Sequence, residues 1–184
     1  CRALNNVTIN RQIDANGFNM PNVMKFESAA PCKIYVPYRS LSAYTDVWSG
    51  KPVVSFDIAA TYNKDTYILS DMGNGRYLLV DFIASNSGTS MTMPNSLSYD
   101  GSNIAIYGIL GDAFIGVSGV MKNLTLPSSV AMIDVTAFAE CEVLENIYVN
   151  TDNRYFTSIN GVLYSKDSKM LVKYPIGRAG KFDM

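Results

Sequence analysis

Residues 121–150 read MKNLTLPSSVAMIDVTAFAECEVLENIYVN and contain one short pattern twice. The pattern is apolar-x-Asn-aliphatic-x-aliphatic, at 121–126 and again at 144–149. A third copy lies at 4–9. Because recurrence of one pattern along a chain is the sequence signature of a repeat architecture, each copy is interpreted as one structural unit.

The second half of each copy has the period of a half-buried β-strand, because aliphatic residues alternate with other residues. Leu124 and Leu126 would point to one side of such a strand and Thr125 to the other. Tyr148 and Thr8 hold the position of Thr125 in the other two copies. We therefore predict that these three residues form a ladder of outward side chains.

The spacing between copies indicates how the chain returns from one strand to the next. Leu124 and Ile147 lie 23 residues apart, and the Ala-Phe pairs at 113–114 and 137–138 lie 24 apart. A period near 23 is too short for a pair of helices and fits one strand with a tight return. One such unit cannot bury its own apolar side, so we predict a solenoid of stacked coils, with Phe138 filling the side opposite the strand.

Two other segments have the pattern of β-hairpins. The first covers residues 66–81, where Gly73-Asn74-Gly75 supplies the positive φ angles of a tight turn between two apolar runs. The second covers residues 155–175, where 166–169 forms a polar turn between two further apolar runs. Both segments are predicted to be hairpins inserted in the solenoid.

Composition excludes several classes of function. The chain has 184 residues, of which 48% are apolar and 17% charged, and its net charge is −1, so nothing favours binding to nucleic acid or to an anionic membrane. It contains no His, which excludes Ser-His and Cys-His catalysis and His-ligated metals. The most apolar region, 104–121, is too short and too rich in Gly to span a membrane, so we expect no membrane insertion in this segment.

The three cysteines, Cys1, Cys32 and Cys141, lack the spacing of a metal site. They are interpreted as small buried hydrophobic residues, with a Cys1–Cys32 disulfide as the alternative.

The repeat resembles the BspA-like leucine-rich repeat, a family of bacterial surface proteins associated with cell adhesion. The family pattern runs L-x-I-P-x-S-V-x-x-I-x-x-x-A-F-x-x-C-x-x-L-x-x-I-x-I. The residues of this chain that carry the resemblance are Leu124, Leu126, Pro127, Ser129, Val130, Ile133, Ala137, Phe138, Cys141, Leu144 and Ile147. Residues 155–175 are similar to a hairpin insertion common in such arrays, and 31–50 to a segment that often closes one.

The resemblance implies a fold class of α/β leaning to β: a leucine-rich-repeat solenoid with parallel strands on one face, short helical or irregular returns and hairpin insertions. It also implies that residues 1–52 end one array and that 53–184 begin a second. The first copy begins inside a repeat and the chain ends without a polar cap, so we expect a piece of a longer protein.

The candidate binding residues are Tyr148, Thr125 and Thr8, on the outward side of the predicted strands. Tyr148 could stack on a sugar or anchor a protein contact, or it could pack on a neighbouring side chain of a solvated strand. Glu140, Glu142 and Asp152 lie in predicted turns and belong to no recognisable catalytic or calcium motif. No catalytic residue, metal site or cofactor is predicted.

Three functions remain open. The first, implied by the resemblance, is a surface or secreted binding module, adhesin-like, whose partner is an extracellular protein or glycan. The second is a structural spacer within a larger surface protein. The third is an enzyme acting on polysaccharide, which the absence of convergent acid and base residues disfavours.

Overall fold

The computed structural model describes residues 6–8, 33–36, 53–55, 57–86 and 88–178. The chain forms two compact units, residues 1–58 and 59–184, whereas the sequence placed a boundary after residue 52. Cys1, Cys32 and the aromatic residues between 38 and 48 lie outside the described residues. No helix among the described residues is long and apolar enough to span a membrane.

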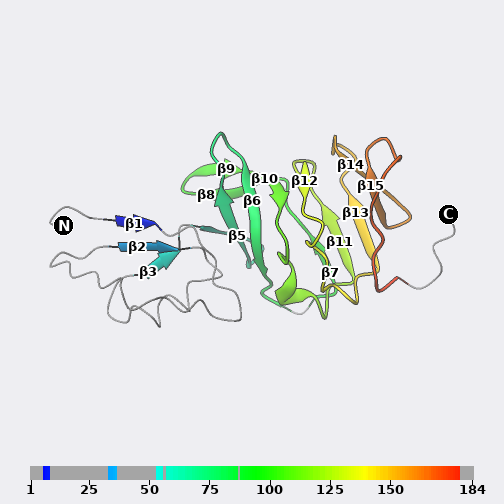
Figure 1. Ribbon diagram of the computed structural model, residues 1–184, viewed down its shortest axis with the longest axis horizontal. Helices are drawn as coiled ribbons and strands as arrows, with labels where there is room; N and C mark the ends of the chain where they lie inside the picture. The colour runs from blue at the N-terminus through cyan, green and yellow to red at the C-terminus, as the bar shows by residue number, and fades with distance from the viewer. Residues whose placement is uncertain (1–5, 9–32, 37–52, 56, 87, 179–184) are drawn as a thin grey trace, which may run out of the picture. The chain divides into compact units, whose positions relative to one another are not determined.

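The first unit contains a three-stranded parallel sheet in the order β1-β2-β3 (Figure 1). Its strands are β1 Asn6–Thr8, β2 Lys33–Val36 and β3 Val53–Ser55. Val7 of the predicted repeat at 4–9 pairs with Ile34, and Ile34 pairs with Val53. The predicted strand at the start of the chain is therefore present, and β2 is its parallel neighbour.

The second unit contains two ladders of parallel strands that the chain visits alternately (Figure 1). One ladder consists of β6 Tyr77–Ile83, β10 Ile106–Ile109 and β12 Met132–Ile133. The other consists of β7 Ser90–Thr92, β11 Asn123–Leu126 and β13 Asn146–Val149. Each passage through both ladders is called a coil here, so the three coils are residues 77–92, 106–126 and 132–149.

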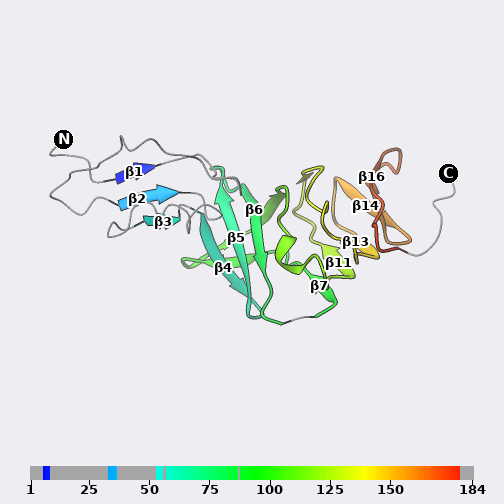
Figure 2. The same cartoon turned by 60° about the horizontal axis from the view of Figure 1, so that its bottom comes forward.

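The pairing of β11 with β13 has the predicted register. Leu124 pairs with Ile147 and Thr125 with Tyr148, which confirms the alignment derived from the sequence. The pairing with β7 extends both rows, because Met91 pairs with Leu124 and Thr92 with Thr125. Figure 2 shows these three strands side by side. The inward residues Met91, Leu124 and Ile147 are all buried, and they pack between coils.

A column of aromatic rings fills the interior away from the β7–β11–β13 ladder. Phe114 and Phe138 stack with ring centroids 5.6 Å apart and ring planes 6° apart. Phe82 continues the column at 6.3 Å from Phe114, and Tyr67 packs edge-on against Phe82 at 5.1 Å. All four rings are buried, which confirms that Phe138 fills the interior, where it packs against Phe114 of the preceding coil.

Hairpins lie before, within and after the coils. β5 Asp65–Asp71 pairs with β6 around the Gly73-Asn74-Gly75 turn, whose φ angles are +77°, +55° and +71°, and β4 Ile58–Tyr62 lies beside β5 at the end of that sheet. β8 Leu97–Tyr99 and β9 Ser102–Ile104 form a short hairpin between the first and second coils.

The segment at 155–175 differs from the prediction in one respect. It folds into β14 Phe156–Ile159, β15 Val162–Ser165 and β16 Leu171–Lys173, three antiparallel strands in place of two. The additional turn is at Asn160-Gly161, where both residues have positive φ, +51° and +80°. The sequence analysis missed this turn because it considered only the polar turn at 166–169.

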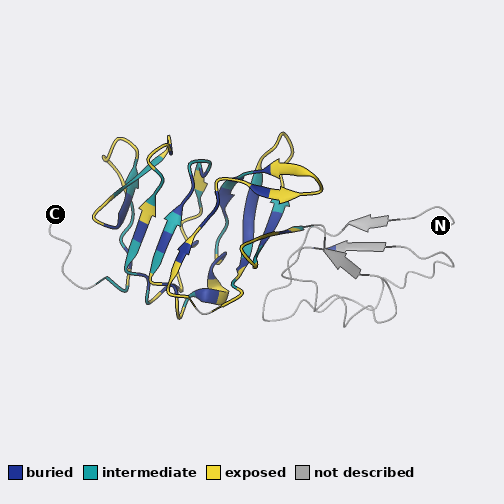
Figure 3. Cartoon of the chain, turned by 180° about the vertical axis from the view of Figure 1, so that it is seen from behind, coloured by how far each residue is buried: buried dark blue, intermediate teal, exposed yellow. Residues whose placement is uncertain are grey.

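The fold class is β-rich, and the α component of the predicted α/β class is not observed among the described residues. The return of the second coil contains one 3₁₀ helix, η2 Ile115–Val117, and the return of the third coil consists of turns. Gly111, Gly116 and Gly119 lie in the return of the second coil, and glycine is unfavourable inside an α-helix. Figure 3 shows the burial along the strands: buried residues alternate with more exposed ones in β7 and β11, whereas β5 and β6 each contain three consecutive buried residues.

Phe138→Ala should test the stacked core, because it removes a ring that is 2% exposed and stacked on Phe114. We expect it to lower the free energy of unfolding by about 2–5 kcal/mol, measured by urea denaturation. Val135→Ala is the matched control, since Val135 is 92% exposed and its truncation should change stability by no more than about 0.5 kcal/mol. Equal stability of the two variants would contradict the packing described here.

Candidate functional site

The outward side of the β7–β11–β13 ladder is the surface that the sequence analysis selected. We call it the outward face. Its residues form two rows across the strands: Ser90, Asn123 and Asn146 in the first, and Thr92, Thr125 and Tyr148 in the second. Side chains at alternate positions of a strand share a face, so both rows lie on the side opposite the buried aliphatic residues.

Hydrogen bonds hold the first row together. Asn123 Nδ2 donates to Ser90 Oγ at 3.1 Å, and Asn146 Nδ2 donates to Asn123 Oδ1 at 2.8 Å. Arg178 donates from its guanidinium to Asn146 Oδ1 at 2.9 Å. These contacts explain why Asn recurs in the repeat pattern, since each amide side chain bonds to the coil beside it.

The second row is free to contact a partner along most of its length. Thr92 is exposed, Thr125 is half-buried, and Tyr148 is 46% exposed. The structure thus brings two of the three candidate residues together, because Thr125 and Tyr148 are register partners. The third, Thr8, pairs with Tyr35 in the other unit, and its side chain lies outside the described residues.

Sequence reasoning missed β7 and therefore missed Ser90 and Thr92. A signal was available, because Met91-Thr92-Met93-Pro94 has the same arrangement as Leu124-Thr125-Leu126-Pro127. Two features obscured it: Ser90 replaces the Asn of the pattern, and 33 residues separate Ser90 from Asn123 where 23 separate Asn123 from Asn146. The β8–β9 hairpin accounts for the longer spacing.

Charged groups near the outward face form a single ion pair among the described residues. Lys122 Nζ lies 2.9 Å from Glu145 Oε1, and both side chains are largely exposed. Such a pair contributes about 0–1 kcal/mol to stability. It joins equivalent positions of successive coils, so it follows the ladder and does not form a separate site.

Carboxylates gather at one other place, a shallow depression beside η2. Asp112, Glu140 and Glu142 line it. No group of three or more His, Cys, Asp or Glu side chains in the described part of the chain has the arrangement of a metal site.

Asp152, considered above for calcium, precedes Asn153, which is 1% exposed and donates from Nδ2 to the carbonyls of Pro127 and Val130 at 2.9 Å. This turn therefore holds the segment after the third coil against the link between the second and third coils.

Cys141 is a buried thiol with a structural environment. Burial raises its pKa from 9.0 to about 11, and the nearby Lys173 opposes this shift only in part. A thiol reacts as its thiolate, so a raised pKa makes Cys141 a poor nucleophile at neutral pH. Its role is to fill space between coils, as the sequence analysis expected.

Comparisons with known proteins give matches in structure only. No protein-family model matches this chain. No curated protein matches it either. Among solved structures, the chain is similar to a leucine rich cell surface protein from Faecalibacterium prausnitzii A2-165, with 16% identity and a TM-score of 0.43 over 53% of this chain and 24% of that one.

Two further structures are similar at lower scores. A leucine-rich repeat protein from Eubacterium ventriosum ATCC 27560 has 15% identity and a TM-score of 0.33, covering 67% of this chain and 52% of that one. The pneumococcal vaccine antigen PcpA has 13% identity and a TM-score of 0.23, covering 66% and 57%. The match thus spans about a quarter of the first structure and about half of the other two. All three TM-scores are below 0.5, a level at which similarity does not establish membership of a family.

Asn146→Ala should test the hydrogen-bonded row. The substitution removes the donor to Asn123 and the acceptor of Arg178, so we expect unfolding to require about 1–3 kcal/mol less free energy. Asn103→Ala, at an exposed position of the β8–β9 hairpin, is the control and should be nearly neutral. Urea denaturation measures the free energy of unfolding of both variants. An Asn146→Ala variant as stable as the unmodified chain would contradict a stabilising role for this row of hydrogen bonds.

Proposed function

We propose that this chain is a non-catalytic binding module of the leucine-rich-repeat type that contacts an extracellular protein or glycan through its outward face. The observation that carries the proposal is the row Thr92, Thr125 and Tyr148, in which Thr92 and Tyr148 are exposed and Thr125 is half-buried, beside a row of side chains bonded to one another. The proposed location is the cell surface or the secreted fraction.

The solenoid part of the proposal is supported by the order of the strands. The chain alternates between two parallel ladders, and successive coils place equivalent residues in register. Backbone contacts repeat as well: the carbonyl of Thr89 accepts from Lys122 and Asn123, and the carbonyl of Lys122 accepts from Glu145 and Asn146. Stacked repeats of this kind present extended surfaces, which proteins with this architecture use for recognition. Assignment to the BspA-like family and the division into two arrays belong to the proposal.

The outward face also has the chemistry of a contact surface. Tyr148 offers a large amphipathic ring with few rotatable bonds, the kind of side chain that anchors protein interfaces and stacks on sugars. The β-strands hold its backbone in place, so less conformational entropy is lost on binding than for a side chain on a mobile loop.

One observation favours the alternative of a structural spacer. The first row satisfies its polar groups within the protein, since Ser90, Asn123 and Asn146 bond to one another. A face on which one of two rows already forms its hydrogen bonds within the protein presents fewer polar groups to a partner. A spacer would tolerate any soluble residue in the second row, and this difference separates the two functions.

The test is a binding screen of this chain against immobilised extracellular-matrix proteins and a glycan array. We expect saturable binding by the unmodified chain. The affinity should fall roughly tenfold or more in the double variant Thr125→Ala, Tyr148→Ala, because an aromatic anchor buried in an interface contributes about 2 kcal/mol or more to binding. Tyr99→Ala is the control, since Tyr99 is 38% exposed and lies on the β8–β9 hairpin.

The double variant must first keep the thermal midpoint of the unmodified chain, so that a lost signal reports recognition. Undiminished binding by a folded double variant would exclude the outward face as the binding surface. Absence of binding by the unmodified chain to every immobilised partner would favour the spacer.

A further inference from the structure

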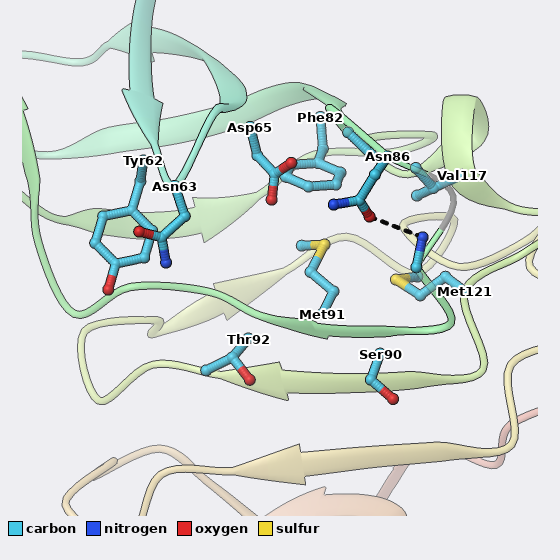
Figure 4. A pocket seen from close by; sticks show the side chains of 12 residues that line it. Tyr62, Asn63, Asp65, Phe82, Asn86, Ser90, Met91, Thr92, Val117 and Met121 are labelled. Carbon is cyan, nitrogen blue, oxygen red and sulfur yellow. Dashed lines mark hydrogen bonds between the residues drawn. The ribbon is translucent and has the colours of Figure 1, made fainter.

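A pocket of about 290 Å³ lies at the β7 end of the outward face (Figure 4). Three parts of the second unit enclose it: the turn between β4 and β5, the segment that follows β6, and β7 itself. Ligand pockets usually measure about 300–1,000 Å³, so this pocket suits one small group, such as a single sugar ring.

The floor of the pocket is apolar and its walls are polar. Phe82, Met91, Val117 and Met121 supply the floor, and each is less than 10% exposed. In Figure 4, Asp65 and Asn86 lie on one side, and Ser90 and Thr92 on the other, with Met91 between them. An apolar base with a few convergent polar groups is the usual composition of a small-molecule site.

The backbone of β7 adds further polar groups. The carbonyl of Thr89 accepts from Asn123, and the N–H of Met93 donates to the carbonyl of Thr125. Backbone groups alternate in direction along a strand, so the backbone N–H and C=O groups of Thr89, Met91 and Met93 face β11. The backbone groups of Ser90 and Thr92 therefore face away from β11, at the edge where the described residues place no further strand.

The wall opposite β7 is held in a defined position. Asp65 Oδ1 accepts from the backbone N–H of Ser85 at 2.8 Å and from its hydroxyl at 3.0 Å. Asn86 Oδ1 accepts from the N–H of Gly88 at 2.9 Å. These hydrogen bonds use one polar atom of each side chain. They leave the other carboxylate oxygen of Asp65 and the amide nitrogen of Asn86 for a ligand.

We propose that this pocket binds one neutral hexopyranose unit of a glycan. Sugar hydroxyls both donate and accept, which matches the carboxylate of Asp65, the amides of Asn63 and Asn86 and the hydroxyl of Thr92 around one cavity. Tyr62, 41% exposed at the rim beside Asn63, offers a ring for the apolar side of the sugar. None of the described residues that line the pocket is Lys or Arg, so among them anionic sugars and phosphorylated ligands find no counter-charge.

An extended peptide fits this site less well. β7 has three residues, and only Ser90 and Thr92 direct backbone groups outward, too few for a stable added strand. Because Thr92 belongs to both the pocket and the outward face, the inference rests on the proposed function and names the chemistry of its ligand at one end of that face.

The experiment is an amide-resolved NMR titration of the chain with the methyl glycosides of glucose, galactose, mannose and N-acetylglucosamine. We expect at least one glycoside to shift the signals of Asn63, Ser90 and Thr92 saturably at millimolar concentration. Tyr62→Ala and Thr92→Val should each weaken that binding by roughly tenfold, the effect of losing one contact of about 1.4 kcal/mol. Thr92→Val keeps the shape of the side chain, which separates loss of the hydroxyl from loss of the fold.

Val135→Ala and Tyr99→Ala are the controls and should bind the same glycoside as the unmodified chain does, since both residues are exposed and neither lines the pocket. Sugar binding by the unmodified chain, together with a failed screen on the outward face, would leave the pocket standing without the wider function. A parallel titration with acetyl-trialanine amide tests the edge of β7 for peptide binding. Three results would overturn the inference: no chemical-shift change with any of the four glycosides, changes that both pocket variants retain, or changes caused only by acetyl-trialanine amide. The last result would assign the edge to a peptide.

Discussion

Contact between the aliphatic side chains of successive coils is the interaction on which the second unit depends. Met91, Leu124 and Ile147 form one inward row, and each is covered only because a neighbouring coil supplies the next member. Strands of three or four residues cannot bury such side chains alone. The aromatic column of Phe82, Phe114 and Phe138 closes the other side of the same interior. The rows stay in register although 33 residues separate Ser90 from Asn123 and 23 separate Asn123 from Asn146, because the β8–β9 hairpin takes up the additional residues.

The same constraint shapes the outward face. Because inward residues are fixed in register, the residues between them are fixed too, and Thr125 comes to lie beside Tyr148. The row of Ser90, Asn123 and Asn146 adds side-chain bonds between coils on the solvent side. The face is therefore preorganised, with one row committed to stability and one row left to solvent. Packing determines where the outward side chains lie, and the proposed recognition depends on their identity.

Much of this arrangement could be predicted from the sequence, and the failures have physical causes. The strands at 123–126 and 146–149 were predictable because Leu124 and Ile147 repeat at a fixed distance within an alternating pattern. β7 was not predicted, since a ten-residue insertion changed the spacing and Met91 replaced the aliphatic residue. The pocket was also missed, because Tyr62, Asp65 and Ser90 come from separate elements whose approach depends on tertiary structure. Periodicity carries the information for a stacked interior, but it carries none for contacts between a hairpin turn and a distant strand.

The central claim is that β7, β11 and β13 are parallel and share one register. Nuclear Overhauser contacts between backbone protons of neighbouring strands test it most directly, on the whole chain and without any substitution. A shared parallel register predicts contacts that join Leu124 to Ile147 and Thr125 to Tyr148 across β11 and β13, and Met91 to Leu124 across β7 and β11. A pattern displaced by one residue would turn the buried row toward solvent. That displacement, or an antiparallel pattern between any two of these strands, would contradict the account.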